Sequence, residues 1–160
     1  MCKIQREANM KVIILGCGRV GSTLARLMLR DGHQVTVVDK NIDAFRRLGP
    51  EFKGTTIIGN GTDEETLKKA GVESADVFVA VTNGDNTNIM SVQIAKTKFQ
   101  VPKPLARIYD PIRACAYQEL GVDTICTTLI DSRLIRDHLL GRELGLAEDY
   151  CSLNDEEAVV

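Results

Sequence analysis

The chain has 160 residues, of which 44% are hydrophobic, and its net charge is −2. A chain of this length can bury a core as one domain, the near-neutral charge argues against a nucleic-acid partner, and no apolar run approaches the roughly 20 residues that span a bilayer. The five cysteines lack CxxC spacing, which argues against a zinc site or a disulfide framework and favours free thiols in a reducing cytoplasm.

The two ends of the chain differ in composition from its middle. Residues 1–9 are mostly polar and show no period, so we expect a flexible N-terminal extension. Residues 10–144 carry the alternating pattern of a folded domain. From Gly145 onward the chain has five acids and no Lys or Arg, so residues 145–160 are predicted to be a mobile, solvated acidic tail.

The first elements of the domain form a βαβ unit around a glycine-rich turn. Residues 12–15 are an apolar run of strand length, residues 16–21 read GCGRVG, and residues 22–30 have a helical pattern. A second apolar run at residues 35–38 ends in Asp39, which follows the glycine motif by 18 residues. Strand, glycine turn, helix, strand and acid at this spacing predict a nucleotide-binding turn.

Each part of this unit has a predicted role. Gly16 allows the tight turn, Gly18 lets a pyrophosphate approach the main chain, and Gly21 lets the helix pack closely. The free N–H groups and the positive dipole at the helix start face an anion, and Arg19 adds a cation there. The carboxylate of Asp39 accepts ribose hydroxyls and repels a 2′-phosphate, which indicates an adenine nucleotide and NAD(H) over NADP(H).

The chain after Asp39 continues to alternate helices and strands. Gly and Pro breaks separate the segments, and Asn41 and either Thr62 or Asp63 are expected to cap helices. The predicted helices cover residues 41–48, 63–70, 85–99, 111–120 and 131–144, and the predicted strands cover residues 55–58, 76–81, 105–109 and 122–126.

Six strands joined by helical segments predict an α/β fold with a doubly wound, Rossmann-like parallel sheet in the order 3-2-1-4-5-6. In this order the first and fourth strands border the point where the sheet reverses direction. The loops that follow these two strands are therefore expected to face one crevice.

Several residues near this crevice allow two interpretations. Cys17 lies near a helix N-terminus, where thiol pKa values fall, so it is either a redox-sensitive thiol or a small side chain at a tolerant position. Asn60, Thr82 and Asn83 either line the crevice or serve the turns. Arg107 contacts a phosphate or a dimer partner, or forms a structural ion pair.

Short motifs extend the pattern over about residues 11–144. They are GCGRVG at 16–21, Val38 with Asp39, GNGTD at 59–63, AVT at 80–82, Asn88, ARI at 106–108 and GVD at 121–123. In combination they resemble the TrkA N-terminal domain family, also called KTN or RCK-N, cytosolic nucleotide-binding regulators of potassium uptake systems and channels. Asn60 stands where the family often has Asp. The C-terminal lobe of full family members is also missing, so we expect a stand-alone lobe or part of a longer polypeptide.

The resemblance implies NAD(H) or AMP, ADP or ATP as the ligand, with Arg19 on phosphate and Asp39 on ribose. It also implies a homo-oligomer joined through residues 131–144, and a potassium transporter or channel subunit as the partner that holds the protein at the cytoplasmic face of the cell membrane. The candidate binding residues are Gly16, Cys17, Gly18, Arg19, Val20, Gly21, Asp39, Lys40, Asn60, Gly61, Thr82, Asn83 and Arg107.

These features favour a non-enzymatic ligand sensor. The alternative is an NAD-dependent oxidoreductase domain. It would lack its substrate domain, because the six strands and their helices account for the length of the chain. A methyltransferase is disfavoured because its cofactor, S-adenosylmethionine, has no phosphate for Arg19. His33 and His138 are isolated, and we expect neither catalytic residues nor a metal site.

Overall fold

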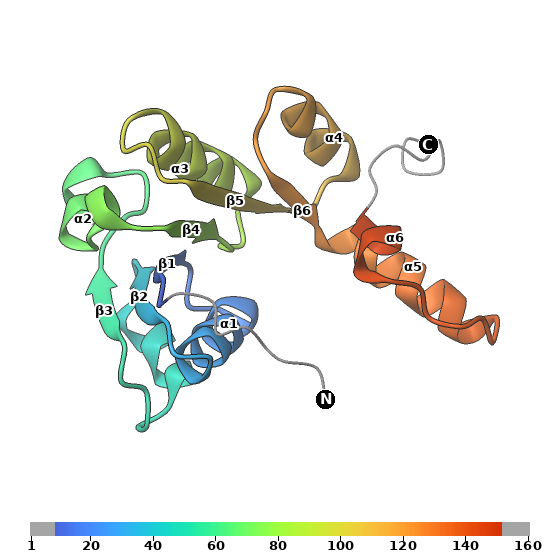
Figure 1. Cartoon of the computed structure of the whole chain (residues 1–160), viewed down its shortest axis with the longest axis horizontal. Coiled ribbons are helices and arrows are strands. Elements are labelled where there is room, and N and C mark those ends of the chain that lie inside the picture. Colours follow the sequence, from blue (N-terminus) through green and yellow to red (C-terminus); the bar gives the residue numbers. More distant parts are fainter. Residues whose placement is uncertain (1–8, 152–160) are drawn as a thin grey trace.

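The computed structural model describes residues 9–151 and contains a six-stranded sheet (Figure 1). Neighbouring strands are all parallel, in the order β3-β2-β1-β4-β5-β6. The predicted Rossmann-like fold and its strand order are therefore confirmed. The strands are β1 Lys11–Leu15, β2 Gln34–Asp39, β3 Thr55–Ile58, β4 Val77–Ala80, β5 Lys103–Ile108 and β6 Thr124–Cys126.

Helices connect the strands and cover both faces of the sheet. They are α1 Arg19–Arg30, η1 Ile42–Leu48, α2 Glu64–Lys69, η2 Val72–Ser74, α3 Asp85–Thr97, α4 Pro111–Glu119, α5 Thr127–Leu139 and α6 Ala147–Cys151. Because successive strand side chains point to opposite faces, Ile14 packs with Ala25 of α1 and Leu48 of η1, whereas Ile13 packs with Val92 of α3. Helices long and apolar enough to cross a membrane are absent from residues 9–151.

Side-chain caps start three of the connecting helices within residues 9–151, among them α4, where the Asp110 carboxylate accepts a hydrogen bond from Ile112 N at 2.9 Å. The Asn41 side chain accepts a hydrogen bond from Asp43 N at 3.0 Å, as predicted. Of the two candidates for α2, the structure selects Asp63, whose carboxylate accepts from Thr66 N at 2.9 Å. Hydrogen bonds from the Thr66 hydroxyl and backbone N–H lower the pKa of Asp63 below its ordinary value.

The last long helix is shifted from its predicted position at residues 131–144. Helix α5 begins at Thr127, directly after β6, and ends at Leu139. The prediction wrongly continued the helix through Gly141, whose φ of 63° lies in the left-handed region that ends helices.

Part of the predicted acidic tail is packed on the fold. Tyr150 of α6 is buried, its hydroxyl accepts a hydrogen bond from Gly145 N at 2.9 Å, and its carbonyl accepts one from Arg133 Nη1 of α5 at 3.2 Å. The expectation of a solvated tail is therefore wrong for Tyr150, whereas Asp149 and Cys151 beside it are exposed. Residues 152–160 and residues 1–8 of the predicted N-terminal extension lie outside the described residues.

Candidate functional site

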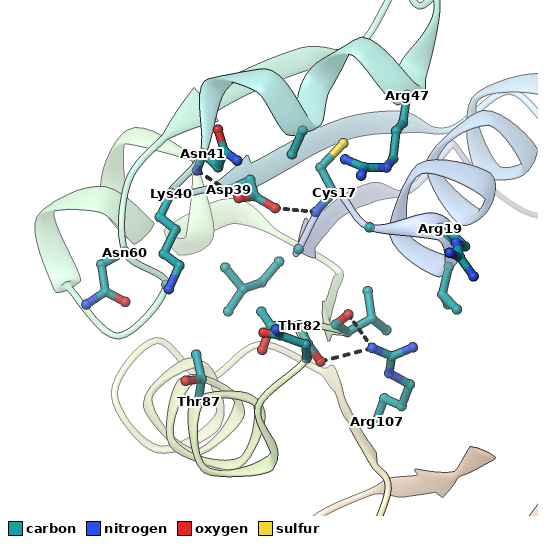
Figure 2. Close-up of a pocket in the computed structure, with 18 of the residues that line it drawn as sticks. Cys17, Arg19, Asp39, Lys40, Asn41, Arg47, Asn60, Thr82, Thr87 and Arg107 are labelled. Atoms are coloured by element: carbon teal, nitrogen blue, oxygen red, sulfur yellow. Dashed lines mark hydrogen bonds between the residues drawn. The ribbon is translucent and has the colours of Figure 1, made fainter. Parts of the chain in front are cut away.

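A cavity of about 1010 Å³ opens where β1, β2 and β4 end (Figure 2). The first and fourth strands are neighbours in the sheet, so the loops after them meet at this point. All of the predicted binding residues except Gly21 line this cavity. The volume suits a nucleotide or dinucleotide, since ligand cavities typically measure about 300 to 1,000 Å³.

The three glycines of the turn have different structural roles. Gly16 has a φ of 102°, and a Cβ there would lie 3.0 Å from Thr82 N. A Cβ on Gly21 would lie 1.8 Å from the Gly16 carbonyl oxygen, so Gly21 serves packing and does not line the cavity. A Cβ on Gly18 would meet nothing within 4 Å. The fold therefore requires Gly16 and Gly21, while Gly18 leaves space in front of the turn.

The N-terminus of α1 faces the cavity and has no side-chain cap. Gly18 is the N-cap residue and offers no side-chain hydrogen bond, and the first turn contains no acid. The free backbone N–H groups and the positive end of the helix dipole thus remain available, and Arg19 adds an exposed cation. This arrangement is suited to a phosphate.

Asp39 lies beside the glycine turn at the end of β2. Its Oδ2 accepts a hydrogen bond from Cys17 N at 2.7 Å and its Oδ1 accepts one from Asn41 N at 2.8 Å. Because a carboxylate has about four acceptor positions, each oxygen can still accept one hydroxyl. Asp39 therefore holds the turn in place and keeps capacity for a ligand diol.

The Cys17 side chain is fully buried beneath the turn. Burial, and next the negative charge of Asp39, raise the pKa of this thiol above its ordinary value of 9.0, although the cations Arg47 and Arg26 lower it in part. Burial and the raised pKa therefore favour the second interpretation, a small side chain with a structural role, over an activated thiol.

We expect Cys17 to react with iodoacetamide at pH 8 at least about tenfold more slowly than the exposed thiol of Cys151. Since its pKa is raised, the rate at Cys17 should keep rising above pH 9.0. Peptide mapping by mass spectrometry over time measures both rates in one sample. Equal rates at pH 8 would show that the turn opens readily.

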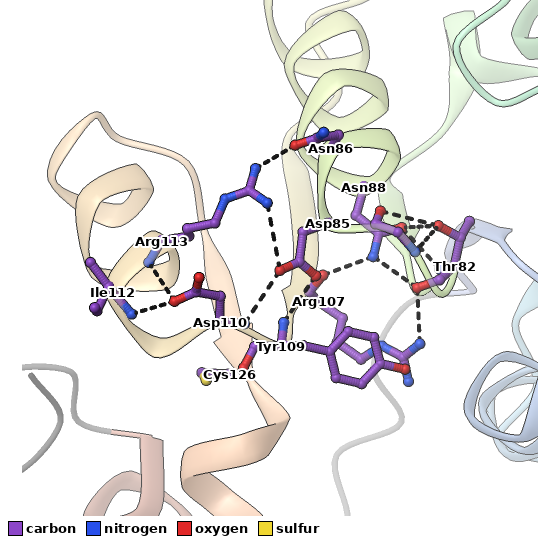
Figure 3. A network of polar contacts seen from close by, with 11 residues as sticks. Thr82, Asp85, Asn86, Asn88, Arg107, Tyr109, Asp110, Ile112, Arg113 and Cys126 are labelled. Carbon is purple, nitrogen blue, oxygen red and sulfur yellow. Dashed lines mark hydrogen bonds and ion pairs between the residues drawn. The ribbon is translucent and has the colours of Figure 1, made fainter. Parts of the chain in front are cut away.

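Thr82 and Asn88 connect β4 to β5 on the other side of the cavity (Figure 3). Asn88 Oδ1 accepts hydrogen bonds from Thr82 N at 2.9 Å and from the Thr82 hydroxyl at 2.7 Å. Asn88 Nδ2 donates to the carbonyl oxygens of Thr82 at 3.0 Å and Arg107 at 2.8 Å. The Thr82 hydroxyl thus donates its proton to Asn88 and has none to donate to a ligand. Thr82 lines the cavity mainly as a residue that holds the turn in place.

Arg107 is nearly buried at the end of β5. Its Nη2 donates to the carbonyl oxygens of Val81 at 2.8 Å and Thr82 at 3.0 Å, and its guanidinium lies 4.5 Å from the centre of the Tyr109 ring. Within residues 9–151, no carboxylate forms an ion pair with Arg107. The interpretation of Arg107 as part of a structural ion pair therefore has no support in the described residues.

Asn60 combines the two roles considered for it. Its Oδ1 accepts hydrogen bonds from Thr62 N at 3.2 Å and the Thr62 hydroxyl at 3.1 Å, while the residue also lines the cavity. The predicted binding residues do not include several others that line the cavity, and their only signal in the sequence is proximity to Asp39, Thr82 or Arg107. Among these others are Asn41, Ala44, Arg47, Thr87 and Tyr109. Groups of three or more potential metal ligands do not occur in the part of the chain that the structure describes.

Comparison with known proteins places this geometry in context. A sequence model of the TrkA-N domain matches residues 12–128. The chain is 46% identical over 135 residues to the "Trk system potassium uptake protein TrkA" of Streptomyces coelicolor, covering 84% of this chain and 59% of that protein. It is 39% identical over 116 residues to a TrkA homolog of Methanothermobacter thermautotrophicus, covering 72% and 53%. The chain thus spans somewhat more than half the length of these relatives.

Solved structures share the fold at low sequence identity. The TrkA-N domain of the inner membrane protein ybaL from Escherichia coli superposes with a TM-score of 0.69 at 20% identity, covering 84% of this chain and 97% of that one. The "Kef CTD in AMP bound form" of Shewanella denitrificans has a TM-score of 0.68 at 23% identity, with 83% of each chain covered. The structure "GsuK bound to ADP" has a TM-score of 0.69 at 20% identity and covers 82% of this chain and 34% of that one.

Proposed function

The chain belongs to the TrkA-N domain family, and from this membership we propose that it is an adenine-nucleotide-binding regulatory domain of a potassium uptake system or channel. The observation that carries the proposal is the uncapped N-terminus of α1, which faces the cavity beside the carboxylate of Asp39. A phosphate suits the first group and a ribose diol suits the second. AMP, ADP and NAD occur in the names of structures with this fold.

We further propose that the domain acts as a sensor and not as an oxidoreductase. Neither histidine of the chain lines the cavity: His33 accepts a hydrogen bond from Met10 N at the start of β1, and His138 is exposed on α5. The ionisable lining side chains Asp39 and Lys40 are suited to contacts with a ribose diol and with phosphate. Ligand binding then acts by favouring one arrangement of subunits over another.

A thermal unfolding series tests the proposed function. We expect ADP, ATP or NADH at 1 mM to raise the midpoint of unfolding by several degrees, since a ligand at about 100 times its Kd stabilises the folded state by about 2.7 kcal/mol. S-Adenosylmethionine, which has no phosphate, should give no shift. If no adenine nucleotide raises the midpoint, the proposed function is wrong.

Asp39→Ala should weaken adenine nucleotide binding by about 1 to 3 kcal/mol, because the ribose hydroxyls lose a charged acceptor and Cys17 N loses its partner. Titration calorimetry measures the change. Asp31→Ala is the matched control, since Asp31 is exposed at the opposite end of α1. Unchanged affinity in the Asp39 variant would exclude Asp39 as the ribose ligand.

We propose that α5 joins two copies of the chain, which a membrane-spanning potassium transporter subunit then holds at the cytoplasmic face of the membrane. Leu139 and Leu140 at the end of α5 are 76% and 60% exposed, and Ile135 is 58% exposed. In Figure 1, α5 runs away from the sheet beyond β6 and is accompanied by α6. This apolar surface has no cover within residues 9–151, and an equivalent surface on a second copy would cover it.

A further inference from the structure

The charges around the cavity are strongly unbalanced. Among the described residues that line it, the cations are Arg19, Lys40, Arg47 and Arg107, and the only carboxylate is that of Asp39. A ligand with several negative charges is therefore favoured over one with few. Three of these cations are long side chains at the rim, whereas Arg107 is only 8% exposed.

Arg107 is the buried member of this set and has unused hydrogen-bonding capacity. Its Nε is buried without a hydrogen-bond partner in the described part of the chain. The contacts that it does make are to neutral groups, namely two carbonyl oxygens and the Tyr109 ring. Asp85, at the start of α3, accepts hydrogen bonds from Tyr109 N and Asp110 N and does not line the cavity. A buried guanidinium without a counter-charge is costly, so its charge is suited to an anionic ligand group.

We propose that Arg107 forms a second anion subsite, which binds the phosphate beyond the first one in an adenosine 5′-diphosphate or triphosphate. The inference rests on the proposed nucleotide function and adds that the site selects polyphosphates over AMP and over NAD⁺. Arg107 is then a specificity-determining residue.

The order of groups along the cavity leads to this assignment. Asp39 accepts a hydrogen bond from the backbone of Cys17, and the turn at Gly16 lies against the backbone of Thr82. The carbonyl oxygen of Thr82 in turn accepts a hydrogen bond from Arg107. A nucleotide with its ribose at Asp39 and its first phosphate at the turn therefore extends toward Thr82 and Arg107. The second phosphate of NAD⁺ carries less negative charge than the terminal phosphate of ADP, and the positively charged nicotinamide ring would follow it toward the guanidinium.

The N-terminus of α3 contributes to the same subsite. Its N-cap residue, Gly84, offers no side-chain hydrogen bond, and Asn83 and Thr87 beside it line the cavity. The positive end of a 13-residue helix thus lies close to Arg107 and adds to the attraction for a second phosphate, which the carboxylate of Asp85 in its first turn reduces in part. Asn88 of the same helix holds the carbonyl groups of Thr82 and Arg107 in place.

Titration calorimetry with AMP, ADP and NAD⁺ at constant ionic strength and without added Mg²⁺ tests the proposal on the full chain. We expect the wild type to bind ADP at least about tenfold more tightly than AMP, because a charge-assisted hydrogen bond to a phosphate is among the stronger polar contacts. Arg107→Gln should reduce this ratio to below about threefold and leave the AMP affinity within threefold of the wild type. NAD⁺ should bind no more tightly than AMP.

Arg113→Gln is the control, since Arg113 of α4 is hydrogen-bonded to Asn86 of α3 but does not line the cavity. It should keep the wild-type ratio. Equal affinities for ADP and AMP in the wild type, or an equal loss of both in Arg107→Gln, would overturn the proposal, whereas absence of all adenine nucleotide binding would overturn the proposed function itself.

A measurement on the wild type covers the case in which Arg107→Gln does not fold. In the NMR spectrum of ¹⁵N-labelled protein, the chemical shift of the Arg107 Nε–H group should change when ADP is added. AMP should change it much less. Identical responses to the two nucleotides would exclude Arg107 from the second phosphate.

Discussion

Gly18→Val is expected to abolish adenine nucleotide binding, with a loss of at least about 100-fold in affinity, while the protein stays folded. The φ of Gly18 is −75°, which a valine adopts without strain, and a Cβ there meets no atom within 4 Å. The added side chain therefore fits the fold but occupies the space through which a phosphate reaches the N-terminus of α1. The cost to helix capping should stay near 1 kcal/mol or less.

Calorimetry and thermal unfolding of the same variant separate binding from folding. Thr23→Val, an exposed substitution on α1, is the matched control and should bind normally. Gly21→Ala should behave in the opposite way to Gly18→Val and lose stability, because its Cβ would lie 1.8 Å from the Gly16 carbonyl oxygen. A folded Gly18→Val variant with normal nucleotide affinity would remove the glycine turn from the site.

The double variant Leu139→Asp with Leu140→Asp should convert a homodimer into monomers that still bind nucleotide. Both side chains are largely exposed in the single chain, so the substitutions leave its core intact. In a dimer they would place unpaired carboxylates against apolar surface, which is strongly unfavourable. Helix α5 lies beyond β6, at the opposite edge of the sheet from β3, so the glycine turn should be unaffected (Figure 1).

Light scattering at micromolar concentration gives the masses. The wild type should show twice the chain mass of 17.6 kDa, and the double variant a single chain. Met90→Asp, at a 55% exposed position on α3, is the control and should remain dimeric. A wild-type mass near one chain, or an unfolded double variant, would place the interface elsewhere.

The order of strands and the glycine turn could be predicted from the sequence because their signals are local. Short apolar runs separated by helical patterns imply right-handed crossovers, and these determine a doubly wound parallel sheet. The GCGRVG turn and Asp39 follow each other within a single βαβ unit. The roles of Gly16 and Gly21 in packing follow from the same spacing.

Other features depend on residues that are distant in the sequence. The pKa of Cys17 is raised because the fold buries it next to Asp39, whereas its sequence position near a helix N-terminus left a lowered pKa open. Arg107 obtains its surroundings from Val81 and Thr82 on another strand. The packing of Tyr150 on α5 likewise ordered a segment whose composition predicts a solvated tail.

Local pattern therefore determined which elements form and where a ligand phosphate is expected. Only the tertiary structure decided which polar groups are satisfied, which buried cation has no carboxylate partner in the described residues, and which apolar surface of α5 remains exposed. The physical reason is that desolvation and pairing depend on all neighbours in space, and most of the neighbours of a buried group come from other strands and helices.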